Sequence, residues 1–277
     1  MPIKIGALLK IEEITADSLS ALSRSGFETL AISFWGSLGP VDLENLADLV
    51  RASSLEVSAL SIFGNPLGNE ETLTAWKELI SHASLFGSPY VTGFAGRVPG
   101  NSVEHSLSAW KETFSSLLEI AYKKECKGLL FENCRMGDLW KRGNWNIAIN
   151  DEAWSLMFNA LDDGKLGLEW EPCHQVEAFL DPLAQLLRWK GKVKHVHGKD
   201  ATVNRQLLSE IGIYSSRKAI TPVLPGLGDT DWASIKAILT QDAYEGCIDI
   251  ESMETTFFNK YEQKLDSLRY LQQCDRN

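Results

Sequence analysis

The stretch VKHVHGKD at residues 193–200 decides the fold, because it has the pattern of a buried strand whose carboxyl end turns abruptly polar. Three other apolar runs end in the same way, at Glu132, Glu171 and Glu251. Charged side chains normally lie on the surface, where water solvates them. Four apolar strands that each end on a carboxylate or an imidazole therefore indicate one shared site.

The rest of the chain alternates short β-like runs with longer amphipathic segments. The expected strands cover residues 3–7, 29–34, 56–62, 90–94, 128–132, 166–171, 193–197 and 247–251. Helical patterns begin near residues 15, 41, 70, 102, 151, 181 and 231, and an eighth runs from about 257 to 271. Because no Pro/Gly/Ser-rich linker divides the 277 residues, this alternation predicts an α/β fold, a single-domain (β/α)8 TIM barrel over residues 1–277.

A doubly wound open sheet is the competing fold. It would normally carry a glycine-rich phosphate loop after an early strand, whereas the segment Gly6–Leu9 offers no G-x-G-x-x-G pattern. In barrel enzymes the chemistry lies at the carboxyl ends of the strands, where the polar residues occur here. The longest connection, Ala201–Gly228, exceeds ordinary loop lengths, and we expect it to cover the site or to support a homo-oligomer.

The charge balance narrows the choice of partners. The chain has 27 Lys and Arg against 37 Asp and Glu, a formal net charge of −10, which opposes binding to a nucleic-acid backbone.

No uncharged run of membrane-spanning length occurs, and the apolar run Ile5–Leu9 is too short for a signal peptide. The five cysteines form no C-x-x-C pair and are expected to be reduced thiols. We therefore expect a cytoplasmic protein that binds neither nucleic acid nor membranes.

Side chains alternate in direction along a strand, so residues two apart share a face. The strand ends thus predict an outer polar layer of Glu132, Glu171, His197 and Glu251. One layer deeper they predict a second polar layer, which would orient the first through hydrogen bonds: Glu169, His195 and Asp249. Three crowded carboxylates repel one another unless a cation lies among them. The oxygen-rich ligand set favours Mn²⁺, with Mg²⁺, Co²⁺, Fe²⁺ or Zn²⁺ as alternatives.

Five motifs in the second half of the chain occur in one order and spacing. They are F-E-N at residues 131–133, G-L-x-x-[DE]-P-x-H at 167–174, H-V-H-x-K-D at 195–200, P-G-x-G-D-x-D-W at 225–232 and Y-x-G-x-x-x-I-E at 244–251. In these motifs the chain resembles the xylose-isomerase-like barrel superfamily, and within it the sugar phosphate isomerase/epimerase group, which includes ketose 3-epimerases and inosose dehydratases. The first half of the chain matches only through its alternation of strands and helices.

The resemblance implies that Glu132, Glu171, His197 and Glu251 are the four metal ligands and that His174 contacts a substrate oxygen. One departure concerns Glu171, because members of the group usually have Asp at this position. The longer side chain moves the carboxylate out by one methylene, which puts the metal position or the substrate spacing in question.

A divalent ion that binds a substrate carbonyl and its neighbouring hydroxyl acidifies the intervening C–H and stabilises an enediolate. Glu132 and Glu251 come from strands far apart around the barrel, so we expect them to act as base and acid on opposite sides of the substrate. Return of the proton to the opposite face gives epimerisation, and return to the neighbouring carbon gives aldose–ketose isomerisation. The leading prediction is a metal-dependent isomerase or epimerase whose partner is a small carbohydrate: a sugar, keto-sugar or cyclic polyol.

Three further residues are candidates for substrate binding. Lys199 follows the His197 tip and could hold a substrate oxygen, although a salt bridge would explain it equally well. Arg135 follows Glu132 and could bind a polyol or an anion, with a surface role as the alternative. Trp35 follows the second strand, and its face suits the C–H faces of sugars, but aromatic side chains also pack barrel rims.

Other functions compete with isomerisation and epimerisation. A lyase that removes water from a keto-sugar or an inosose would use the same metal site. A DNA-repair nuclease of the endonuclease IV type would need many more histidines than the five present, and a basic surface. A barrel that binds its ligand without turning it over would have little reason to cluster buried charge.

Overall fold

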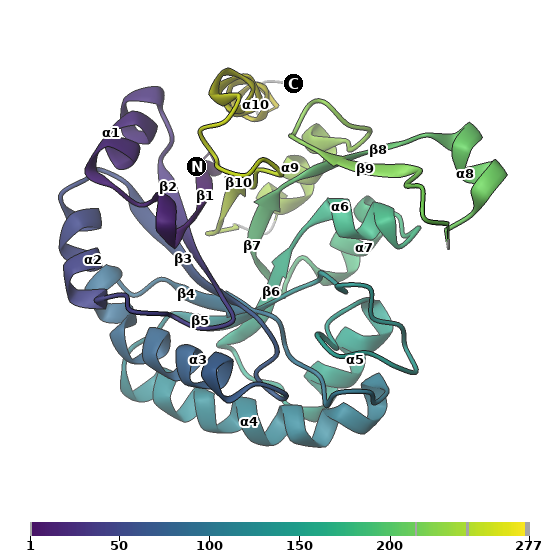
Figure 1. Cartoon of the computed structure of the whole chain (residues 1–277), viewed down its shortest axis with the longest axis horizontal. Coiled ribbons are helices and arrows are strands. Elements are labelled where there is room, and N and C mark those ends of the chain that lie inside the picture. The colour runs from purple at the N-terminus through teal and green to yellow at the C-terminus, as the bar shows by residue number, and fades with distance from the viewer. Residues whose placement is uncertain (1, 214, 242–243, 275–277) are drawn as a thin grey trace.

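Eight parallel strands close into a barrel (Figure 1). The computed structural model describes residues 2–213, 215–241 and 244–274. In chain order the wall strands are β1 (Lys4–Lys10), β2 (Thr29–Trp35), β3 (Glu56–Phe63), β4 (Tyr90–Gly93), β5 (Gly128–Glu132), β6 (Leu166–Trp170), β7 (Val193–Gly198) and β10 (Cys247–Ile250). Their order around the wall is β1-β10-β7-β6-β5-β4-β3-β2, so the first and last strands pair and close the barrel. The predicted TIM barrel is confirmed, and the open-sheet alternative is wrong.

Helices surround the barrel (Figure 1), and their buried apolar residues belong to the hydrophobic core. They are α1 (Ala16–Ser25), α2 (Leu43–Arg51), α3 (Glu70–His82), α4 (Val103–Lys123), α5 (Asp151–Ala160), α7 (Pro182–Trp189), α9 (Trp232–Gln241) and α10 (Tyr261–Gln273), with short 3-10 helices η1 (Ile11–Glu13) and η2 (Ala83–Phe86). The side chains of Thr15, Asp42 and Asn69 accept backbone N–H groups and so begin α1, α2 and α3. Among the residues that the structure describes, no helix combines the length and apolar composition needed to cross a membrane.

The last helix begins later than the sequence pattern predicts. The pattern places its start near residue 257, whereas α10 begins at Tyr261. Phe257 instead packs its ring against Phe27, with ring centroids 5.8 Å apart, and donates its backbone N–H to Glu13. Lys260, with a φ of 51°, then leads the chain into the helix. Tertiary contacts of Phe257 therefore override the local helical pattern.

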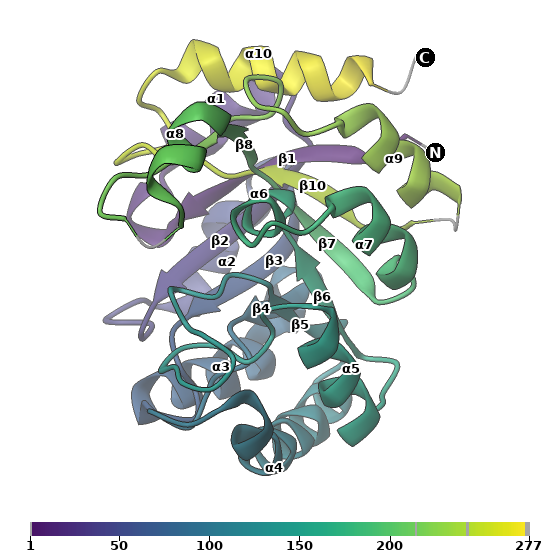
Figure 2. The ribbon, with the colours of Figure 1, turned by 90° about the vertical axis from the view of Figure 1, so that its right-hand side faces the viewer.

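The long connection after β7 has secondary structure of its own. It contains β8 (Asp200–Val203), α8 (Arg205–Ile211) and β9 (Ile220–Val223), and β8 pairs with β9 antiparallel. This arm extends outward beyond the ring of helices in Figure 1. Its two strands pack against the short helix α6 (Pro172–Glu177), which lies below the arm in Figure 2.

A buried carboxylate fixes the base of the arm. Asp200 accepts hydrogen bonds from the backbone N–H groups of Ala201, Gly226 and Thr230 and from the indole N–H of Trp232. The PGLGD turn at residues 225–229 is thereby held against the start of β8. These contacts give the turn a structural role, as a connection into α9.

Candidate metal centre

Four side chains meet at the carboxyl end of the barrel wall. Glu132 ends β5, Glu171 follows β6, His197 lies in β7 and Glu251 follows β10. These strands are consecutive neighbours in the wall, so their ends lie side by side. One ligand atom from each residue lies within 4.8 Å of the others. The structure thus brings together the whole outer layer expected from the sequence.

The imidazole of His197 occupies the middle of this group. Its Nδ1 lies 3.0 Å from Glu132 Oε1, 3.6 Å from Glu171 Oε2 and 3.5 Å from Glu251 Oε2. The side chains of His197 and Glu171 are fully buried, and that of Glu251 is 20% exposed. Nδ1 therefore faces three carboxylates, which is the orientation that a ligating imidazole needs.

Several of these buried atoms lack an aligned hydrogen bond. Within the described part of the chain, His197 Nδ1, Glu171 Oε1 and Glu251 Oε2 have no hydrogen-bond partner. Leaving such a group buried and unsatisfied costs about 1–3 kcal/mol. A divalent cation among these donors would satisfy His197 Nδ1 and Glu251 Oε2 and neutralise the carboxylates, so the residues fit the ion that the ligand set predicts.

A second polar group lies directly beneath the first. His197 Nε2 lies 3.1 Å from Glu169 Oε1, which also lies 2.8 Å from His195 Nδ1. His195 Nε2 in turn contacts Asp249 Oδ2 at 2.8 Å. Burial disfavours the charged form of Glu169, but His197 and His195 outweigh burial and lower its pKa to about 2. Glu169, His195 and Asp249 thus form the connected inner layer that the strand alternation predicts.

The amino-terminal strands complete the inner group. Thr29 on β2 donates its hydroxyl to Asp249 Oδ1 at 2.5 Å, and Ser58 on β3 donates to Oδ2. Gly6 on β1 makes room for them, because a Cβ there would lie 2.0 Å from Thr29 Oγ1 and 2.1 Å from Asp249 Oδ1. A cavity of about 740 Å³, lined by Thr29, Ser58 and His195, lies at the end of the barrel opposite the carboxyl ends of the strands.

Lys199 joins two of the outer carboxylates. Its Nζ lies 3.0 Å from Glu171 Oε1 and 2.8 Å from Glu251 Oε1. Burial raises the pKa of Glu251 to about 7, although Lys199 opposes the rise. Burial also opposes ionisation of Glu171, but His174 and Lys199 lower its pKa below the usual range. Lys199 is therefore an ion-pair partner inside the site, and its contact with a substrate oxygen stays a prediction.

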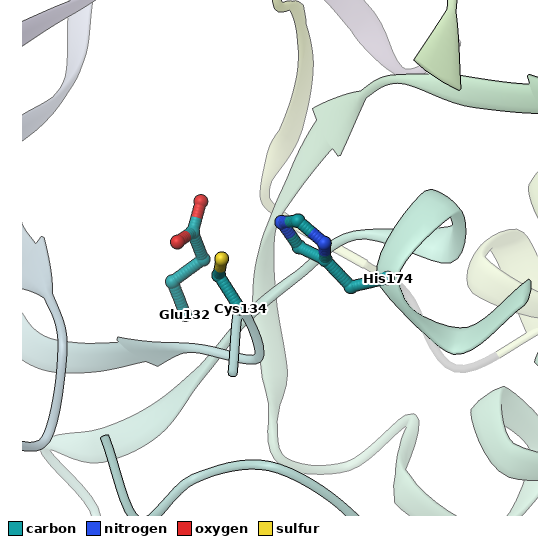
Figure 3. Close-up of side chains that lie close together, drawn as sticks. All are labelled: Glu132, Cys134 and His174. Atoms are coloured by element: carbon teal, nitrogen blue, oxygen red, sulfur yellow. The ribbon is translucent and has the colours of Figure 1, made fainter. Parts of the chain in front are cut away.

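His174 on α6 lies at the edge of the same group. Its Nε2 is 3.2 Å from Glu171 Oε1, and its Nδ1 is 3.0 Å from Glu177 Oε2. The thiol of Cys134 and the carboxylate of Glu132 lie close to this imidazole (Figure 3). Cys134 is a residue of the site that the sequence patterns do not single out.

Aromatic rings form one side of the barrel mouth. Trp35 is 60% exposed, and its ring centroid lies 6.2 Å from that of Phe63 and 6.3 Å from that of Trp145. Phe63 in turn lies 6.3 Å from the His197 ring. A cavity of about 330 Å³ opens beside this wall and reaches Glu251. The indole of Trp35 therefore faces the space through which a ligand would approach the carboxylates.

Arg135 takes a different position from the other candidates. Its side chain is exposed, and it donates a hydrogen bond to the backbone carbonyl of Asp138 at 3.3 Å. The described residues that line the cavity beside Glu251 do not include it. The structure therefore does not bring Arg135 together with the carboxylate group, and its role in substrate binding stays a prediction.

Residues 19–274 match the family described as the xylose isomerase-like TIM barrel. The chain belongs to this family. The inosose dehydratase of Clostridium beijerinckii (strain ATCC 51743 / NCIMB 8052) is 22% identical over 282 residues, which cover 95% of this chain and 90% of the relative. The uncharacterized protein YfiH of Bacillus subtilis (strain 168) is also 22% identical, over 87% of this chain and 88% of the relative.

Solved structures share the xylose isomerase-like barrel over their whole length. L-ribulose 3-epimerase superposes with a TM-score of 0.70 at 16% identity, over 100% of this chain and 96% of that chain. The 3-keto-D-glucoside 4-epimerase of E. coli has a TM-score of 0.68 at 14% identity, over 98% of this chain and 100% of that chain. At these identities the likeness is one of fold.

Two asparagines hold the ligands of this xylose isomerase-like site in place. Asn133 donates to the Glu171 carbonyl at 2.9 Å and accepts the Glu171 N–H at 2.7 Å, which ties the β5 tip to the β6 tip. Asn146 donates to the carbonyls of Glu132 and Cys134, both at 2.8 Å. Asn133 follows Glu132 directly, so the sequence offers a signal for it. Asn146 lies 14 residues beyond Glu132, and the sequence offers no such signal there.

Proposed function

We propose that the protein is a divalent-metal-dependent isomerase or epimerase that acts on a sugar, keto-sugar or cyclic polyol through an enediolate. One observation carries the proposal: four ligand atoms from neighbouring strand ends lie within 4.8 Å of one another, and several are buried without a hydrogen-bond partner among the described residues. Sugar epimerases with the same fold support it.

Glu132, Glu171, His197 and Glu251 would hold the metal, for which the oxygen-rich set favours Mn²⁺. When bound, the ion would act as a Lewis acid toward a substrate carbonyl and its neighbouring hydroxyl. The inner group would orient His197, because Glu169 lies 3.1 Å from its Nε2 while Nδ1 faces the outer carboxylates.

Glu132 and Glu251 are the proposed proton carriers. In the barrel wall β6 and β7 separate their strands, so the two carboxyl groups reach the substrate from different sides. In the metal-free protein burial raises the pKa of Glu251 to about 7. A bound ion would keep this carboxylate ionised, which is the form that accepts a proton from the substrate. Lys199, 2.8 Å away, would keep the Glu251 carboxylate in place.

The cavity beside Glu251 is the proposed substrate pocket. Its charged lining consists of four glutamates and one lysine: Glu12, Glu13, Glu251, Glu254 and Lys10. Lys10 Nζ already donates to the Thr255 carbonyl at 2.8 Å. Such a lining accepts hydroxyl hydrogens and repels phosphate, so we propose an unphosphorylated substrate that packs a C–H face on Trp35. His174 would contact a substrate oxygen.

Isotope exchange tests the proposal. The protein is loaded with Mn²⁺ and incubated in D₂O with free ketoses, their phosphate esters and inososes, and the products are separated and weighed by mass spectrometry. Deuterium incorporation into an isomeric product is expected with a free ketose and not with its phosphate ester. Absence of exchange with every substrate would contradict the proposed function.

Carboxamide variants test the assigned residues. Glu132→Gln and Glu251→Gln each remove a proton carrier, and we expect each to lower the exchange rate by about 10²- to 10⁴-fold. Glu112→Gln makes the same chemical change at an exposed position on α4 and serves as the control. If both Glu132→Gln and Glu251→Gln exchange deuterium as fast as this control, the assignment of Glu132 and Glu251 as proton carriers fails.

Dehydration is a second candidate on the same site. The Clostridium inosose dehydratase, similar over 95% of this chain, is the observation that favours it. Loss of a β-hydroxyl from the enediolate would replace return of the proton to carbon. In the D₂O experiment this outcome is a product lighter by one water, and it would replace the isomerase assignment while keeping the metal site.

A further inference from the structure

We propose that Cys134, His174 and Glu132 form a second cation site beside the first, which takes thiophilic divalent ions such as Zn²⁺ or Cd²⁺ and through which these ions inhibit the enzyme. The binding part of this inference depends only on the geometry of the three side chains. The inhibition part rests on the proposed function.

The three ligand atoms are already close together. The Cys134 thiol, a Glu132 carboxylate oxygen and a His174 ring nitrogen all lie within 4.8 Å of one another. Cys134 follows Glu132 by two residues, just beyond the end of β5. Figure 3 shows the thiol beside the carboxylate and the imidazole facing them from α6.

His174 has the orientation expected of a metal ligand. Its Nδ1 lies 3.0 Å from Glu177 Oε2, and a carboxylate on one ring nitrogen is the usual partner of an imidazole that binds a metal through the other. Its Nε2 points into the site, 3.2 Å from Glu171 Oε1. One nitrogen is thus anchored and the other is directed toward the group.

A carboxylate oxygen of Glu171 lies at the edge of this group. Its side chain is fully buried, and its Oε1 has no aligned hydrogen bond among the residues that the structure describes. This oxygen contacts His174 on one side and Lys199 Nζ, at 3.0 Å, on the other. A cation held by Cys134 and His174 would lie next to this oxygen and could use it as a fourth ligand.

The chemistry of the donors separates the two sites. The first offers three carboxylates and one imidazole, which suit Mn²⁺ or Mg²⁺. The second adds a thiol, and soft sulfur ligands with imidazole select Zn²⁺ and Cd²⁺. The thiol binds as a thiolate and the imidazole binds through an unprotonated Nε2, so the protons on Cys134 Sγ and His174 Nε2 leave to the solvent when an ion binds.

Inhibition follows because both sites use Glu132. The same carboxylate belongs to the outer group and to the group with Cys134. An ion bound at Cys134 would draw this carboxylate away from the substrate carbon, and it would also occupy His174, the proposed contact for a substrate oxygen.

Cobalt titration tests the binding part. Co²⁺ is added to the metal-free protein and the near-ultraviolet thiolate-to-cobalt charge-transfer absorption is recorded together with the number of ions bound. We expect two ions per chain with a thiolate band in the wild-type protein, and one ion without the band in Cys134→Ser. One ion without a band in the wild-type protein would overturn the site.

Two further cysteine variants serve as controls. Cys274→Ser changes a thiol near the carboxyl terminus and should keep the band. Cys247 belongs to the other described thiol-containing group, with His195 and Asp249, so a band lost in Cys247→Ser and kept in Cys134→Ser would overturn the assignment. His197→Ala should keep the band while it loses the first ion, and near-ultraviolet circular dichroism of each variant verifies its fold.

The inhibition part is measured as zinc sensitivity. With Mn²⁺ present, Zn²⁺ should slow deuterium exchange by the wild-type protein. Each protein's rate is divided by its own rate without Zn²⁺. On this scale Cys134→Ser should need at least about tenfold more Zn²⁺ than the wild-type protein for the same fractional loss. Equal sensitivity of the two proteins would overturn inhibition through this site. A cobalt band without any deuterium exchange would leave the site standing and overturn the proposed function alone.

Discussion

His195 and His197 lie two residues apart on β7, yet they face different chemical surroundings. Nδ1 of His197 is directed at the three outer carboxylates, the nearest oxygen being 3.0 Å away. His195 instead lies between Glu169 and Asp249, with 2.8 Å from each ring nitrogen to a carboxylate oxygen. A substitution at either position therefore removes a different kind of contact.

Alanine at each histidine should have a distinct effect. His197→Ala removes a ligand and is expected to abolish Mn²⁺ binding. His195→Ala leaves two buried carboxylates without their partner, so we expect about 10- to 100-fold weaker binding and about 3–5 kcal/mol lower free energy of unfolding. Calorimetric Mn²⁺ titration and urea denaturation measure the two effects. Loss of binding in His195→Ala alone would mean that His195, and not His197, is the residue that holds the ion.

The pH should change the number of protons that the ion displaces. In the metal-free protein burial raises the pKa of Glu251 to about 7, and, although burial opposes it, Glu169 and the other carboxylates raise the pKa of His197 well above its usual value. Above about pH 7 Glu251 is ionised, so the ion displaces about one proton, from His197. Below that pH Glu251 is protonated too, so about two protons leave.

Calorimetric titration of Mn²⁺ in buffers of different ionisation enthalpy measures this proton release. In Glu251→Gln the extra proton at low pH should disappear, while the proton from His197 should remain. A release that does not change across neutral pH in the wild-type protein would contradict the assignment of Glu251 as a titrating ligand.

The positions of single residues were predictable only where a strand holds them. Residues two apart on a strand share a face, which places His195 and His197 on the same side of β7 in successive layers. Cys134 lies just beyond β5 and its partner His174 on α6, so no periodic pattern relates them. Arg135 shows the opposite problem, since proximity to Glu132 in the sequence did not bring its side chain into the group.

At the scale of elements, Gly6 on β1 lies in close contact with side chains of β2 and β10. A Cβ at this position would overlap the hydroxyl of Thr29 and the carboxylate of Asp249, which hydrogen-bond to each other. The strands can approach because position 6 carries no side chain. The geometry of the inner polar group thus depends on a residue that contributes no polar atom.

Gly6→Ala should consequently destabilise the protein and loosen the site. Forcing a methyl group into a packed interior costs about 1–3 kcal/mol, and here it must also displace Asp249. Gly164→Ala is the matched control, because a Cβ there meets nothing within 4 Å. Urea denaturation compares the two variants, and equal stability would show that the strands relax without cost.

The wall strands and most of the helices were predictable because each repeats one clear pattern. The elements that the sequence did not reveal are α6, β8, α8 and β9, which are at most seven residues long. Runs of this length carry too little periodicity to identify, and Pro222 within β9 argues against a strand. β8 and β9 pair with each other and pack against α6, and Asp200 fixes the turn that follows them, which is tertiary information.

For the molecule as a whole, a bound ion should be a source of stability. The four proposed ligands come from the ends of β5, β6, β7 and β10, so only the folded chain offers the complete set. Mn²⁺ at about 100 times its dissociation constant should raise the free energy of unfolding by about 2.7 kcal/mol. Chemical denaturation with and without EDTA measures the difference, and His197→Ala should show none. A wild-type protein indifferent to Mn²⁺ would contradict the site.

The pairing of β1 with β10 also sets the order of events when the chain is synthesised. β1 lacks one of its two neighbours until residues 247–250 have been made. Glu251, the last of the four proposed ligands, follows directly. The complete set of proposed ligands therefore exists only when almost the whole chain has been made. Until then β1 carries an unpaired edge, and an unpaired strand edge is a template for aggregation.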